Sequence, residues 1–532
     1  MPVMDVDFLI IGSGFGGSVS ALRLVEKGYR VVMLEKGRRL GPSDFPRSNW
    51  NLKRWLWLPV LGFRGLFKMT FLRHVTVLSG VGVGGGSLVY ANTLPIPKDD
   101  FFAAKSWERL ADWKRELAPH YLKVRKMLGA AENPHTTAAD DMVREIGRDL
   151  GLPESEFCQS PVAVWFGEPG VTVSDPYFGG EGPERTGCTQ CGGCMIGCQH
   201  GAKNTLDKNY LWLAEKRGLV IEADTEAIWV REVPSGGYQV EALQGASIFG
   251  RTRRTWRASN VIFAGGVLGT VPLLLKLRTS PDGLSRLSPR VGDFVRTNSE
   301  ALLGVVSGRR DVDYSKGIAI GSVLHTDEHS HLEPVRYPSG SGFFRLLVAP
   351  HAPGRSAPGR AVRAIGQLLR HPLRALRAFF VLDWAKHTVI LLYMRALEGH
   401  LRMSLGSGGR LRTSVSGGVA PSASIPEATD LALRAAEKLK GFPEGLVTEL
   451  LLDTPTTAHI LGGACMGGTP EEGVIDARHR VFGYEGLYVI DGAAMSANPG
   501  VNPALTIAAL AERAMSFVPP KDAALVGAPG PI

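Results

Sequence analysis

Four cysteines lie close together in the middle of the chain, at Cys188, Cys191, Cys194 and Cys198. Their spacing, C-x2-C-x2-C-x3-C, is the one that bacterial ferredoxins use to hold an iron–sulfur cluster. Four thiolates are also a common ligand set for structural zinc, although this spacing is tighter than the usual paired arrangement. Since spacing alone does not identify a metal, three interpretations stay open: an iron–sulfur cluster, a zinc site, or a metal-free loop with tight glycine turns.

A glycine-rich turn near the N-terminus has the residue types that bind a dinucleotide. It reads G-x-G-x-x-G at Gly12, Gly14 and Gly17, with Phe15 between them. The first glycine permits a tight turn, the second lets the backbone approach a pyrophosphate, and the third lets helix and strand pack closely. The following helix would face the phosphates with its positive dipole end. Glu35, at the end of the next predicted strand, is placed to accept hydrogen bonds from ribose hydroxyls, which favours FAD or NAD over NADP.

A second glycine cluster, LSGVGVGGGSLVYANTL at residues 78–94, favours FAD over NAD. Its run of backbone amides would lie along the cofactor, and the absence of side chains would let it touch an isoalloxazine ring. The two clusters together predict an FAD site built from separate parts of the chain.

Several motifs together resemble the glucose–methanol–choline (GMC) oxidoreductases, most closely their cholesterol oxidase-like actinobacterial branch. The resemblance covers nearly the whole chain, and its most specific motifs lie towards the two ends. It implies bound FAD, a flavin domain of discontinuous segments, and a substrate domain whose antiparallel sheet roofs the flavin. The motifs that carry it are the N-terminal glycine turn, GVGGGSLVYAN (82–92), GAKNTLDKNYL (201–211), FAGGVLGT (263–270), TAHILGGACMG (457–467) and GLYVIDGAAMSANPGVNPALTIAALAER (486–513).

The resemblance also implies which residues contact the cofactor. The backbone at Glu226 would lie near the adenine. No histidine is found between Tyr90 and Thr93, where some relatives attach FAD covalently, so non-covalent FAD is expected. The residues that would line the flavin are Gly86, Ala91, Thr93, Gly492, Asn502 and Ala504.

Oxidising an unactivated alcohol requires a group that takes the hydroxyl proton while a hydride leaves the carbon, and histidine suits that role near neutral pH. Among the 13 histidines, His459 stands apart because the glycines around it let a flavin and the next strand come close. Asn502, just before a predicted helix, supplies an amide that can donate to the substrate oxygen and touch the flavin edge. In the resembled family these two positions form the active-site pair, and histidine with asparagine is the form found in cholesterol oxidases.

Glu333 is a further candidate, in the segment HSHLEPVRYP. Steroid oxidases of the resembled type use an active-site carboxylate to move a proton from C4 to C6, which converts a Δ5-3-ketone to the Δ4-3-ketone. Such a base needs a desolvated position near the ring face and a raised pKa. The match is loose, and Arg336 nearby could instead make Glu333 one half of an ordinary ion pair.

The net charge of +9 raises the question of a nucleic-acid partner. The basic residues are spread along the chain and follow no recognition motif, so no nucleic-acid binding is expected. Two local concentrations, residues 49–68 and 360–380, interleave Arg or Lys with Trp, Leu and Phe. That pattern suits peripheral contact with a membrane, or a lid over an apolar ligand. The alternative is an ordinary helix face whose other side lies in the core.

The chain opens with a strand-like run and shows neither an export-signal pattern nor an apolar stretch long enough to span a bilayer. Clustered thiols without an export signal indicate a reducing compartment. A cytoplasmic protein is therefore expected, with membrane association left open.

The predicted fold class is α/β, with a Rossmann-like doubly wound FAD-binding domain of discontinuous segments and an α+β substrate domain containing an antiparallel sheet. Apolar runs predict buried strands at 6–12, 29–37, 260–270 and 486–495, a helix at 18–28 ending at Gly28, sheet strands within 387–406, and a loop at 349–360. The FAD-binding domain is assigned to 1–45, 77–95, 199–300 and 478–520, the substrate domain to 46–76, 96–198 and 301–477, and a flexible tail to 521–532.

These features predict FAD-dependent oxidation of a secondary alcohol on a hydrophobic substrate, with a 3β-hydroxysteroid as the favoured class and Δ5 to Δ4 isomerisation as an added step. Oxygen or another electron acceptor would reoxidise the flavin, and an iron–sulfur cluster at the cysteines would favour a single-electron carrier. The first alternative is a GMC dehydrogenase for another apolar alcohol with a non-oxygen acceptor. The second is a flavin-bearing electron-transfer or membrane-surface protein without alcohol chemistry.

Overall fold

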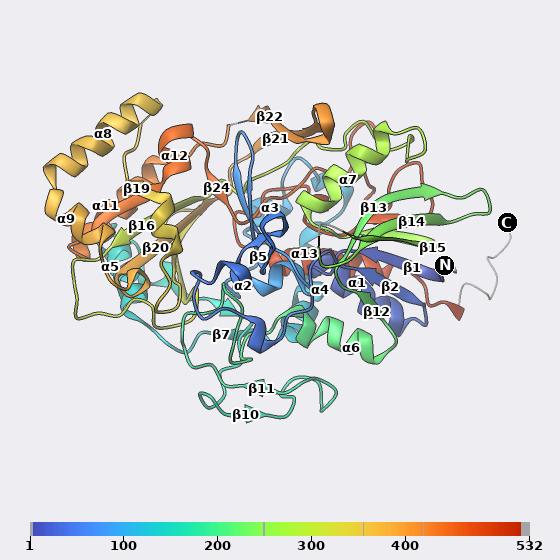
Figure 1. The fold of residues 1–532 in the computed structure, drawn as a ribbon, viewed down its shortest axis with the longest axis horizontal. Coiled ribbons are helices and arrows are strands. Elements are labelled where there is room, and N and C mark those ends of the chain that lie inside the picture. The colour runs from blue at the N-terminus through green and yellow to red at the C-terminus, as the bar shows by residue number, and fades with distance from the viewer. Residues whose placement is uncertain (1–3, 248–249, 355, 419, 523–532) are drawn as a thin grey trace.

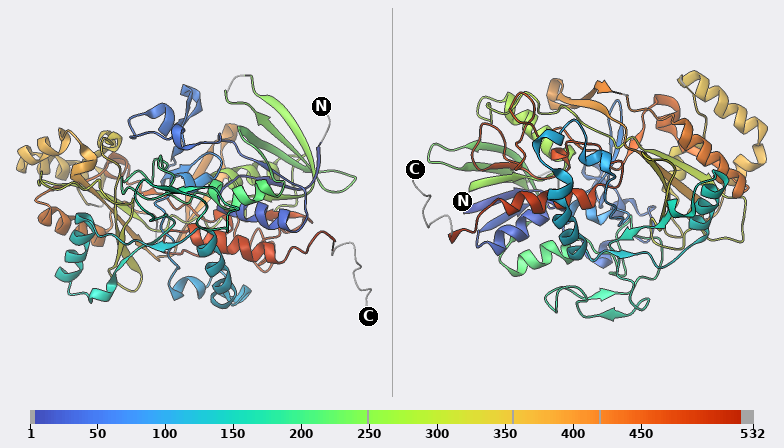
Figure 2. Two further views of the ribbon diagram at one scale, coloured as in Figure 1. Left: turned by 90° about the horizontal axis from the view of Figure 1, so that it is seen from below. Right: turned by 180° about the vertical axis from the view of Figure 1, so that it is seen from behind.

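A computed structural model describes residues 4–247, 250–354, 356–418 and 420–522 of the chain. Two seven-stranded sheets organise these residues. Figure 1 shows the two sheets side by side along the long axis of the molecule. The views in Figure 2 show helices outside both sheets and long irregular segments between them.

The first sheet begins with β1, the buried strand predicted from the N-terminal apolar run. Its order is β12-β2-β1-β15-β14-β13, and β25 pairs with β15. Strand β1 runs parallel to both of its neighbours, β2 and β15. The β12–β2 and β15–β25 pairs are also parallel, whereas β13, β14 and β15 form an antiparallel meander. Its strands are β1 (Met4–Ile11), β2 (Val31–Leu34), β12 (Val220–Glu222), β13 (Thr225–Glu232), β14 (Tyr238–Gln244), β15 (Thr252–Phe263) and β25 (Leu487–Val489). The prediction of a Rossmann-like α/β fold is confirmed.

Helix α1 (Phe15–Glu26) starts three residues earlier than its sequence pattern predicted, directly after the glycine turn. It ends at Glu26, two residues before the predicted end, and Gly28 follows with a left-handed φ of 84° that L side chains rarely adopt. Helix α1 packs against α6 (Tyr210–Lys216) and α13 (Ala504–Ser516), and α13 packs against α4 (Trp113–Met127). The buried carboxylate of Glu512 joins these helices through contacts with Arg23, Lys123 and Tyr210.

The second sheet is antiparallel throughout, in the order β19-β23-β16-β20-β18-β17-β8. Helices α5 (Ala138–Asp149) and α11 (Pro426–Lys438) cover one face and form a separate apolar core with it. Its strands are β8 (Phe157–Gln159), β16 (Ala301–Val306), β17 (Ser322–His325), β18 (Ser330–Val335), β19 (Val348–Pro350), β20 (Thr388–Arg395) and β23 (Phe442–Leu446). The predicted strands within 387–406 are present as β20 and as β21 (Gly399–Leu405), which pairs with β22 (Leu411–Gly418).

A small sheet links the segments that lead to the two functional motifs. Strand β6 (Thr76–Gly80) enters the second glycine cluster, and β24 (Thr456–Thr457) precedes His459. β6 pairs with β24 and with β5 (Phe67–Phe71). The remaining short elements include α2 (Leu52–Trp55), α3 (Asp99–Phe102), α7 (Val267–Thr279), α10 (Trp384–His387), β3 (Trp57–Leu58), β4 (Phe63–Arg64), β7 (Ala131–Glu132), β9 (Pro161–Val162), β10 (Thr172–Val173) and β11 (Arg185–Thr186).

The two basic, apolar segments differ in structure. Within 49–68, Trp55 is fully buried while Val60 and Leu61 are exposed. The segment 360–380 is helical, as α8 (Ala357–Arg370) and α9 (Pro372–Phe379), so α8 begins inside the predicted loop 349–360. Pro358 does not prevent this, because its missing N–H falls in the first turn.

No helix within the described ranges is long and apolar enough to cross a bilayer. At the start of the predicted flexible tail, Lys521 forms an ion pair with Asp7 and donates its backbone N–H to Lys27. The tail residues 523–532 lie outside the described residues. The predicted domain boundaries stay a prediction.

Candidate active site

A cavity of about 990 Å³ lies between the first sheet, the small linking sheet and the second sheet. Its wall contains residues from every segment that the sequence analysis assigned to the cofactor or to catalysis. Gly17 is the one predicted cofactor residue outside its wall, since it packs against the turn itself. The predicted residues that line the cavity are Gly12, Gly14, Phe15, Glu35, Gly86, Ala91, Thr93, Glu226, His459, Gly492, Asn502 and Ala504.

Each of the three glycines of the N-terminal turn has a different physical reason to lack a side chain. Gly12 has a φ of 109°, and a Cβ there would lie 2.3 Å from the carbonyl oxygen of Ala264. A Cβ on Gly17 would lie 2.1 Å from the oxygen of Gly12, so this glycine lets α1 pack on the turn. A Cβ on Gly14 would meet no protein atom within 4 Å. The space beside Gly14 therefore opens into the cavity, where a cofactor phosphate would approach the backbone.

The N-terminus of α1 is free to bind an anion, because Gly14 is its N-cap and offers no side chain to the first N–H groups. Glu35 lies at the end of β2 and lines the cavity. One carboxylate oxygen of Glu35 accepts hydrogen bonds from the N–H and hydroxyl of Ser13, and the other accepts from the N–H of Gly37. These bonds hold the carboxylate at the position where the resemblance expects ribose hydroxyls.

Asp491 is a cavity residue that the sequence analysis did not single out. It follows β25, and its carboxylate accepts hydrogen bonds from Thr270 and from the backbone N–H groups of Gly266 and Ala493. Burial raises the pKa of Asp491 to about 6 against the effect of these bonds. A polar side chain at the carboxyl end of a predicted strand in a doubly wound sheet was the available signal.

His459 lies beside a buried carboxylate. Its Nδ1 is 3.2 Å from Oε2 of Glu300, which forms an ion pair with it, and its backbone N–H donates to the hydroxyl of Thr457. That hydroxyl donates in turn to Glu300. Burial is the largest effect and lowers the pKa of His459, but the charge of Glu300, its hydrogen bond and the charge of Glu333 together outweigh burial and raise the pKa above the usual value. With Nδ1 facing Glu300, Nε2 is the ring nitrogen left for the cavity.

Asn502 is supported by a second buried carboxylate. Its amide Nδ2 donates to Oε2 of Glu333 at 3.4 Å, while its Oδ1, on a cavity-lining residue, has no hydrogen-bond partner among the residues that the structure describes. Oε1 of Glu333 lies 3.6 Å from Nε2 of His331. Arg336, the alternative partner expected from sequence, instead contacts Asp140 at 3.3 Å. Glu333 therefore lies behind Asn502, outside the cavity wall.

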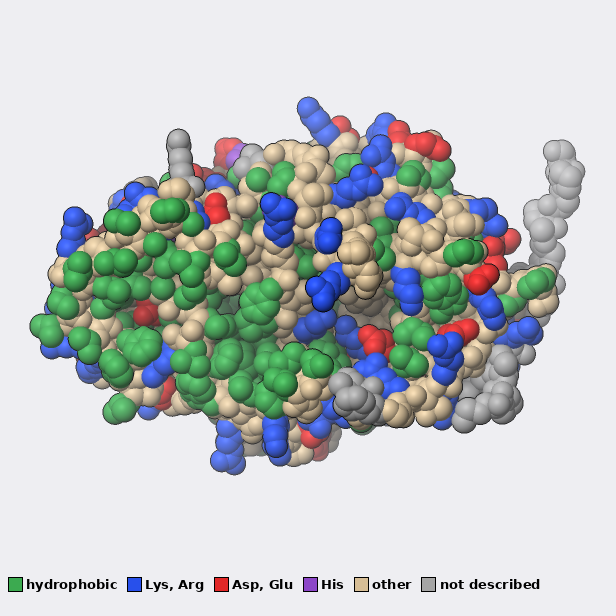
Figure 3. Space-filling model, turned by 45° about the horizontal axis from the view of Figure 1, so that its top comes forward, with side chains coloured by type: hydrophobic (Ala, Val, Ile, Leu, Met, Phe, Trp, Pro, Cys, Tyr) green, Lys and Arg blue, Asp and Glu red, His purple; other side chains and the backbone are tan. Residues whose placement is uncertain are grey.

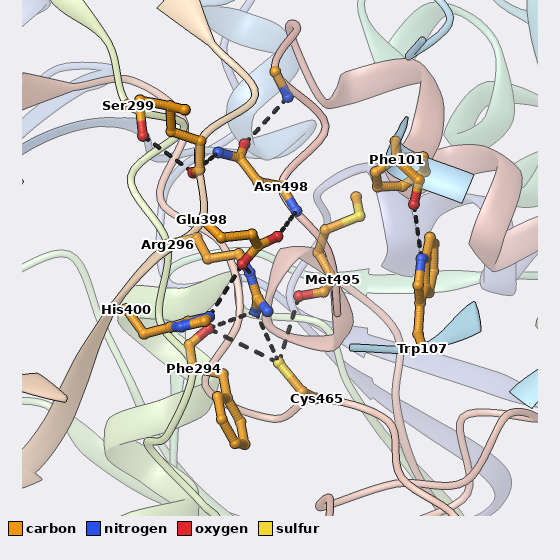
Figure 4. A network of polar contacts seen from close by, with 12 residues as sticks. Phe101, Trp107, Phe294, Arg296, Ser299, Glu398, His400, Cys465, Met495 and Asn498 are labelled. Atoms are coloured by element: carbon orange, nitrogen blue, oxygen red, sulfur yellow. Dashed lines mark hydrogen bonds and ion pairs between the residues drawn. The ribbon is translucent and has the colours of Figure 1, made fainter. Parts of the chain in front are cut away.

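A polar network fixes the loops that carry these groups (Figure 4). Arg296 donates to the carbonyl oxygen of Phe294 and lies 3.5 Å from Glu398. Glu398 also contacts His400 and accepts the backbone N–H of Asn498, four residues before Asn502. The backbone of Arg296 pairs with Leu461, two residues after His459. The network thus ties the segments that carry Glu300, His459 and Asn502 to one another.

The thiols of the cysteine loop are not grouped as a metal-ligand set in the described residues. Within the residues that the structure describes, no group of three or more His, Cys, Asp or Glu side chains could hold a metal ion. All four thiols are free, and Cys191 is exposed whereas Cys194 is buried. Burial raises the pKa of Cys188 to about 12 and that of Cys194 to about 11, so a metal would have to displace a proton from each of them. An iron–sulfur or zinc site at Cys188, Cys191, Cys194 and Cys198 stays a prediction.

The loop packs against the cavity wall. The buried ammonium of Lys203 donates to the carbonyl oxygens of Leu88, Tyr90 and Cys194, which joins the cysteine loop to the second glycine cluster. Met195 lines the cavity. The loop's glycines and the lysine therefore support the cofactor side of the site.

The dinucleotide turn and the cavity beneath it define a dinucleotide-binding protein of the Rossmann type. Residues 10–51 match an NAD(P)-binding Rossmann-like domain, and residues 423–511 match the family described as GMC oxidoreductase. The chain belongs to the GMC oxidoreductase family, as predicted, and is an FAD-dependent alcohol oxidoreductase.

Relatives align along almost the whole chain. A cholesterol oxidase of Acinetobacter baumannii is 44% identical over 97% of this chain and 95% of its own length. A cholesterol oxidase of Mycobacterium tuberculosis is 45% identical over 97% of this chain and 92% of its own length. Pyridoxine 4-oxidase from Mesorbium loti shares the fold, with a TM-score of 0.62 and 16% identity over 96% of this chain and 99% of that one.

The residues around the glycine turn fit FAD. The space beside Gly14, the uncapped start of α1 and the carboxylates of Glu35 and Asp491 provide an opening, N–H donors and hydroxyl acceptors along one side of the cavity. FAD, when bound, supplies the acceptor for the hydride that leaves the alcohol carbon.

Replacing Gly14 by Ala tests this cofactor site. The added methyl group meets no protein atom, so the fold should persist, but it occupies the space that a phosphate would enter. We expect a stably folded protein whose flavin content after purification is less than half that of the wild type. Gly366→Ala, whose Cβ also meets nothing, is the matched control and should keep its flavin. Full flavin occupancy in Gly14→Ala would contradict the assignment.

Replacing Glu300 by Gln tests the pairing with His459. Loss of the negative charge removes the effect that raises the pKa of His459, so the limb of the pH–rate profile that reports this histidine should move to lower pH. We expect kcat to fall about tenfold, the effect of losing about 1.4 kcal/mol of stabilisation.

Glu449→Gln is the control for Glu300→Gln. Burial raises the pKa of Glu449 to about 8, so this substitution changes little charge at neutral pH, and Glu449 does not line the cavity. The pH profile of this control should stay in place. An unchanged profile in Glu300→Gln would show that the carboxylate does not set the state of His459.

Proposed function

We propose that this chain oxidises the 3β-hydroxyl of cholesterol, or of a closely related sterol, to the ketone, with oxygen as the electron acceptor. The observation that carries the proposal is the 44–45% identity with two cholesterol oxidases over 97% of the chain. The substrate side of the cavity supports it, because the second sheet lines that side with apolar residues such as Ile320, Val335, Ile390 and Leu392.

In this proposal His459 and Asn502 bind the reacting hydroxyl. Nε2 of His459 takes the hydroxyl proton, and the charge of Glu300 at Nδ1 stabilises the imidazolium that results. The Asn502 amide orients the substrate oxygen, and Glu333 holds that amide from behind. The apolar wall excludes water from the reacting carbon.

Isomerisation of the product stays part of the proposal, with Glu333 as the proton carrier. Glu333 is opposite Leu392 in the register of β18 and β20, so it faces the cavity side of the sheet. Asn502 covers it there, so the amide would have to move aside before the carboxylate could reach a substrate carbon.

Oxidation of a different apolar alcohol is the first alternative. A long-chain-alcohol oxidase of Arabidopsis thaliana is 25% identical over 94% of this chain and 65% of its own length, well below the two cholesterol oxidases. The second alternative, a flavin protein without alcohol chemistry, gives no role to the pairing of His459 with Glu300 and of Asn502 with Glu333.

We also propose that the enzyme takes its substrate from an anionic lipid bilayer, through the surface formed by α8 and α9. Val362, Ile365, Leu369, Leu373 and Phe380 on this surface are each more than half exposed. Figure 3 shows hydrophobic side chains gathered over the end of the molecule where Figure 1 places these helices. An outward apolar face on a helix pair is typical of interfacial helices.

The charge of this surface matches anionic headgroups. Residues 357–380 contain five arginines and no Asp or Glu, and all of these arginines except the buried Arg360 are exposed. Arginine near an anionic leaflet contributes about 1 kcal/mol of attraction per residue. Bilayer contact would therefore combine apolar insertion with attraction to acidic lipids.

The surface is continuous with the cavity. Helix α8 packs against α12 (Val447–Leu452), whose first residues, Val447 and Thr448, line the cavity. Leu346 and Phe71 are more than half exposed and line the cavity as well. A sterol could then pass from lipid into the cavity between apolar side chains.

Anaerobic reduction tests the proposed chemistry. Cholesterol added without oxygen should bleach the flavin absorbance of the purified enzyme. His459→Ala should keep its flavin but be reduced about 10²- to 10⁴-fold more slowly, the usual effect of losing a general base. An enzyme that is reduced by other long apolar alcohols but not by cholesterol would support the first alternative. Reduction by cholesterol at the wild-type rate in His459→Ala would contradict the role of this residue.

Vesicle flotation tests the lipid surface. The enzyme should float with phosphatidylcholine vesicles containing phosphatidylserine, less with phosphatidylcholine alone, and less at high salt. Leu373→Glu should reduce flotation at least tenfold, whereas Leu122→Glu, at an equally exposed leucine on α4, should float like the wild type. Absence of flotation, or a lipid-free dimer that Leu373→Glu converts to a monomer, would show that the surface does not serve a membrane.

A further inference from the structure

Glu444 is a buried carboxyl that the proposed reaction does not use. It lies on β23, is 7% exposed, and lines the substrate side of the cavity. Its Oε2 has no hydrogen-bond partner among the described residues. A buried carboxyl oxygen without a partner is costly, so a group that arrives with a ligand is the physical explanation of its position.

The register of the second sheet places Glu444 far from the reacting hydroxyl. Neighbouring strands pair Glu444 with Gly304, Gly304 with Ile390, and Ile390 with Val335. These four residues therefore form one row across the sheet, and all of them face the cavity. Three strand spacings separate Glu444 from Val335, a distance of about 14 Å. Glu333, two residues before Val335, marks the end of the sheet that touches Asn502.

The groups between these two ends are apolar or small. Leu302, Gly304, Ile390 and Leu392 line the cavity along the rows that connect them. A sterol with its 3-hydroxyl at His459 and Asn502 would lie along these rows, with its side chain directed to β23. The end of the molecule remote from the reacting carbon would then meet Glu444.

Further polar atoms surround Glu444. Trp384 lines the cavity beside it and acts on its carboxyl as a side-chain hydrogen-bond donor, while Nε of Arg345 has no hydrogen-bond partner among the described residues. Burial raises the pKa of Glu444 to about 7, against the effects of Trp384 and Arg345. Near neutral pH the carboxyl is therefore present in both forms, and can donate to or accept from a hydroxyl group.

We propose that Glu444 binds a hydroxyl group at the far end of the substrate, so that the preferred substrates are sterols hydroxylated at the end of their side chain. The inference rests on the proposed function, because that function sets the direction in which the substrate lies. An unsubstituted apolar tail leaves the carboxyl unpaired, whereas a terminal hydroxyl satisfies it. Sites built to bind a hydroxyl discriminate against analogues that lack it.

The test compares kcat/KM for cholesterol and for cholesterol hydroxylated at the end of its side chain. The wild type should prefer the hydroxylated sterol by about tenfold or more, the effect expected of one satisfied buried hydrogen bond. Glu444→Met, which keeps the length but removes the polar atoms, should lose this preference and oxidise cholesterol at least as well as the wild type. Glu444→Gln should keep a preference, since its amide still donates and accepts.

Leu446→Met is the matched control, because Leu446 also lines the cavity from β23 and carries no polar group. Its preference should equal that of the wild type, and flavin content would confirm that each variant folds. Equal kcat/KM for the two sterols in the wild type, or an unchanged preference in Glu444→Met, would overturn the inference while leaving sterol oxidation intact. Failure of the wild type to oxidise either sterol would overturn the proposed function and this inference together.

Discussion

The site depends on the close approach of backbone segments that are far apart in the chain. A Cβ on Gly12 would collide with Ala264, one on Gly16 would lie 1.7 Å from the oxygen of Ile490, and one on Gly85 would lie 2.7 Å from Gly14. The end of β15, the end of β25 and the second glycine cluster therefore meet at the start of α1 only because these positions carry no side chain. The cavity, its N–H donors and the carboxylates at its edge all follow from this convergence.

The two groups proposed to bind the alcohol are each held by a buried carboxylate from the second sheet. Glu300 immediately precedes β16 and faces His459, whereas Glu333 lies within β18 and holds Asn502. His459 and Asn502 come from the segments around β24 and before α13, so each pair joins the substrate sheet to the cofactor side of the molecule. Two carboxylates thus act in a mainly apolar cavity. Glu300 raises the pKa of the His459 ring, and Glu333 orients the Asn502 amide.

The same sheet gives the cavity two chemically different ends. Side chains alternate across each strand, so the face that carries Leu302, Ile390 and Leu392 is the face opposite the apolar core formed with α5 and α11. Glu333 and Glu444 interrupt this face at its two ends. At the outer end, α8 and α12 continue the apolar lining to the surface, which connects the proposed route of the substrate with the proposed place of the reaction.

Local patterns in the sequence were enough to predict the family, the Rossmann-like sheet and the residues around the glycine turn, because each rests on chemistry within one strand–turn–helix unit. Gly12, Gly14 and Glu35 were assigned from spacing alone, and β1, β2 and α1 lie close to where periodicity placed them. His459 and Asn502 were named from their motifs, and the structure places both on one cavity. Glu300 and Glu444 carried no motif, and Asp491 lay in a motif that assigned it no role, since their roles depend on strand register and on partners 140 or more residues away. The cysteine spacing suggested a metal, but burial and backbone pairing hold Cys191 at the surface and Cys194 in the interior.

The sequence by itself determined which short segments could bind a dinucleotide and which residue types could take a proton, because those properties are local. Only the tertiary structure decided which carboxylates stand behind His459 and Asn502, and which thiols of the cysteine run are buried, because long-range packing sets the distances between groups that the chain order leaves unrelated.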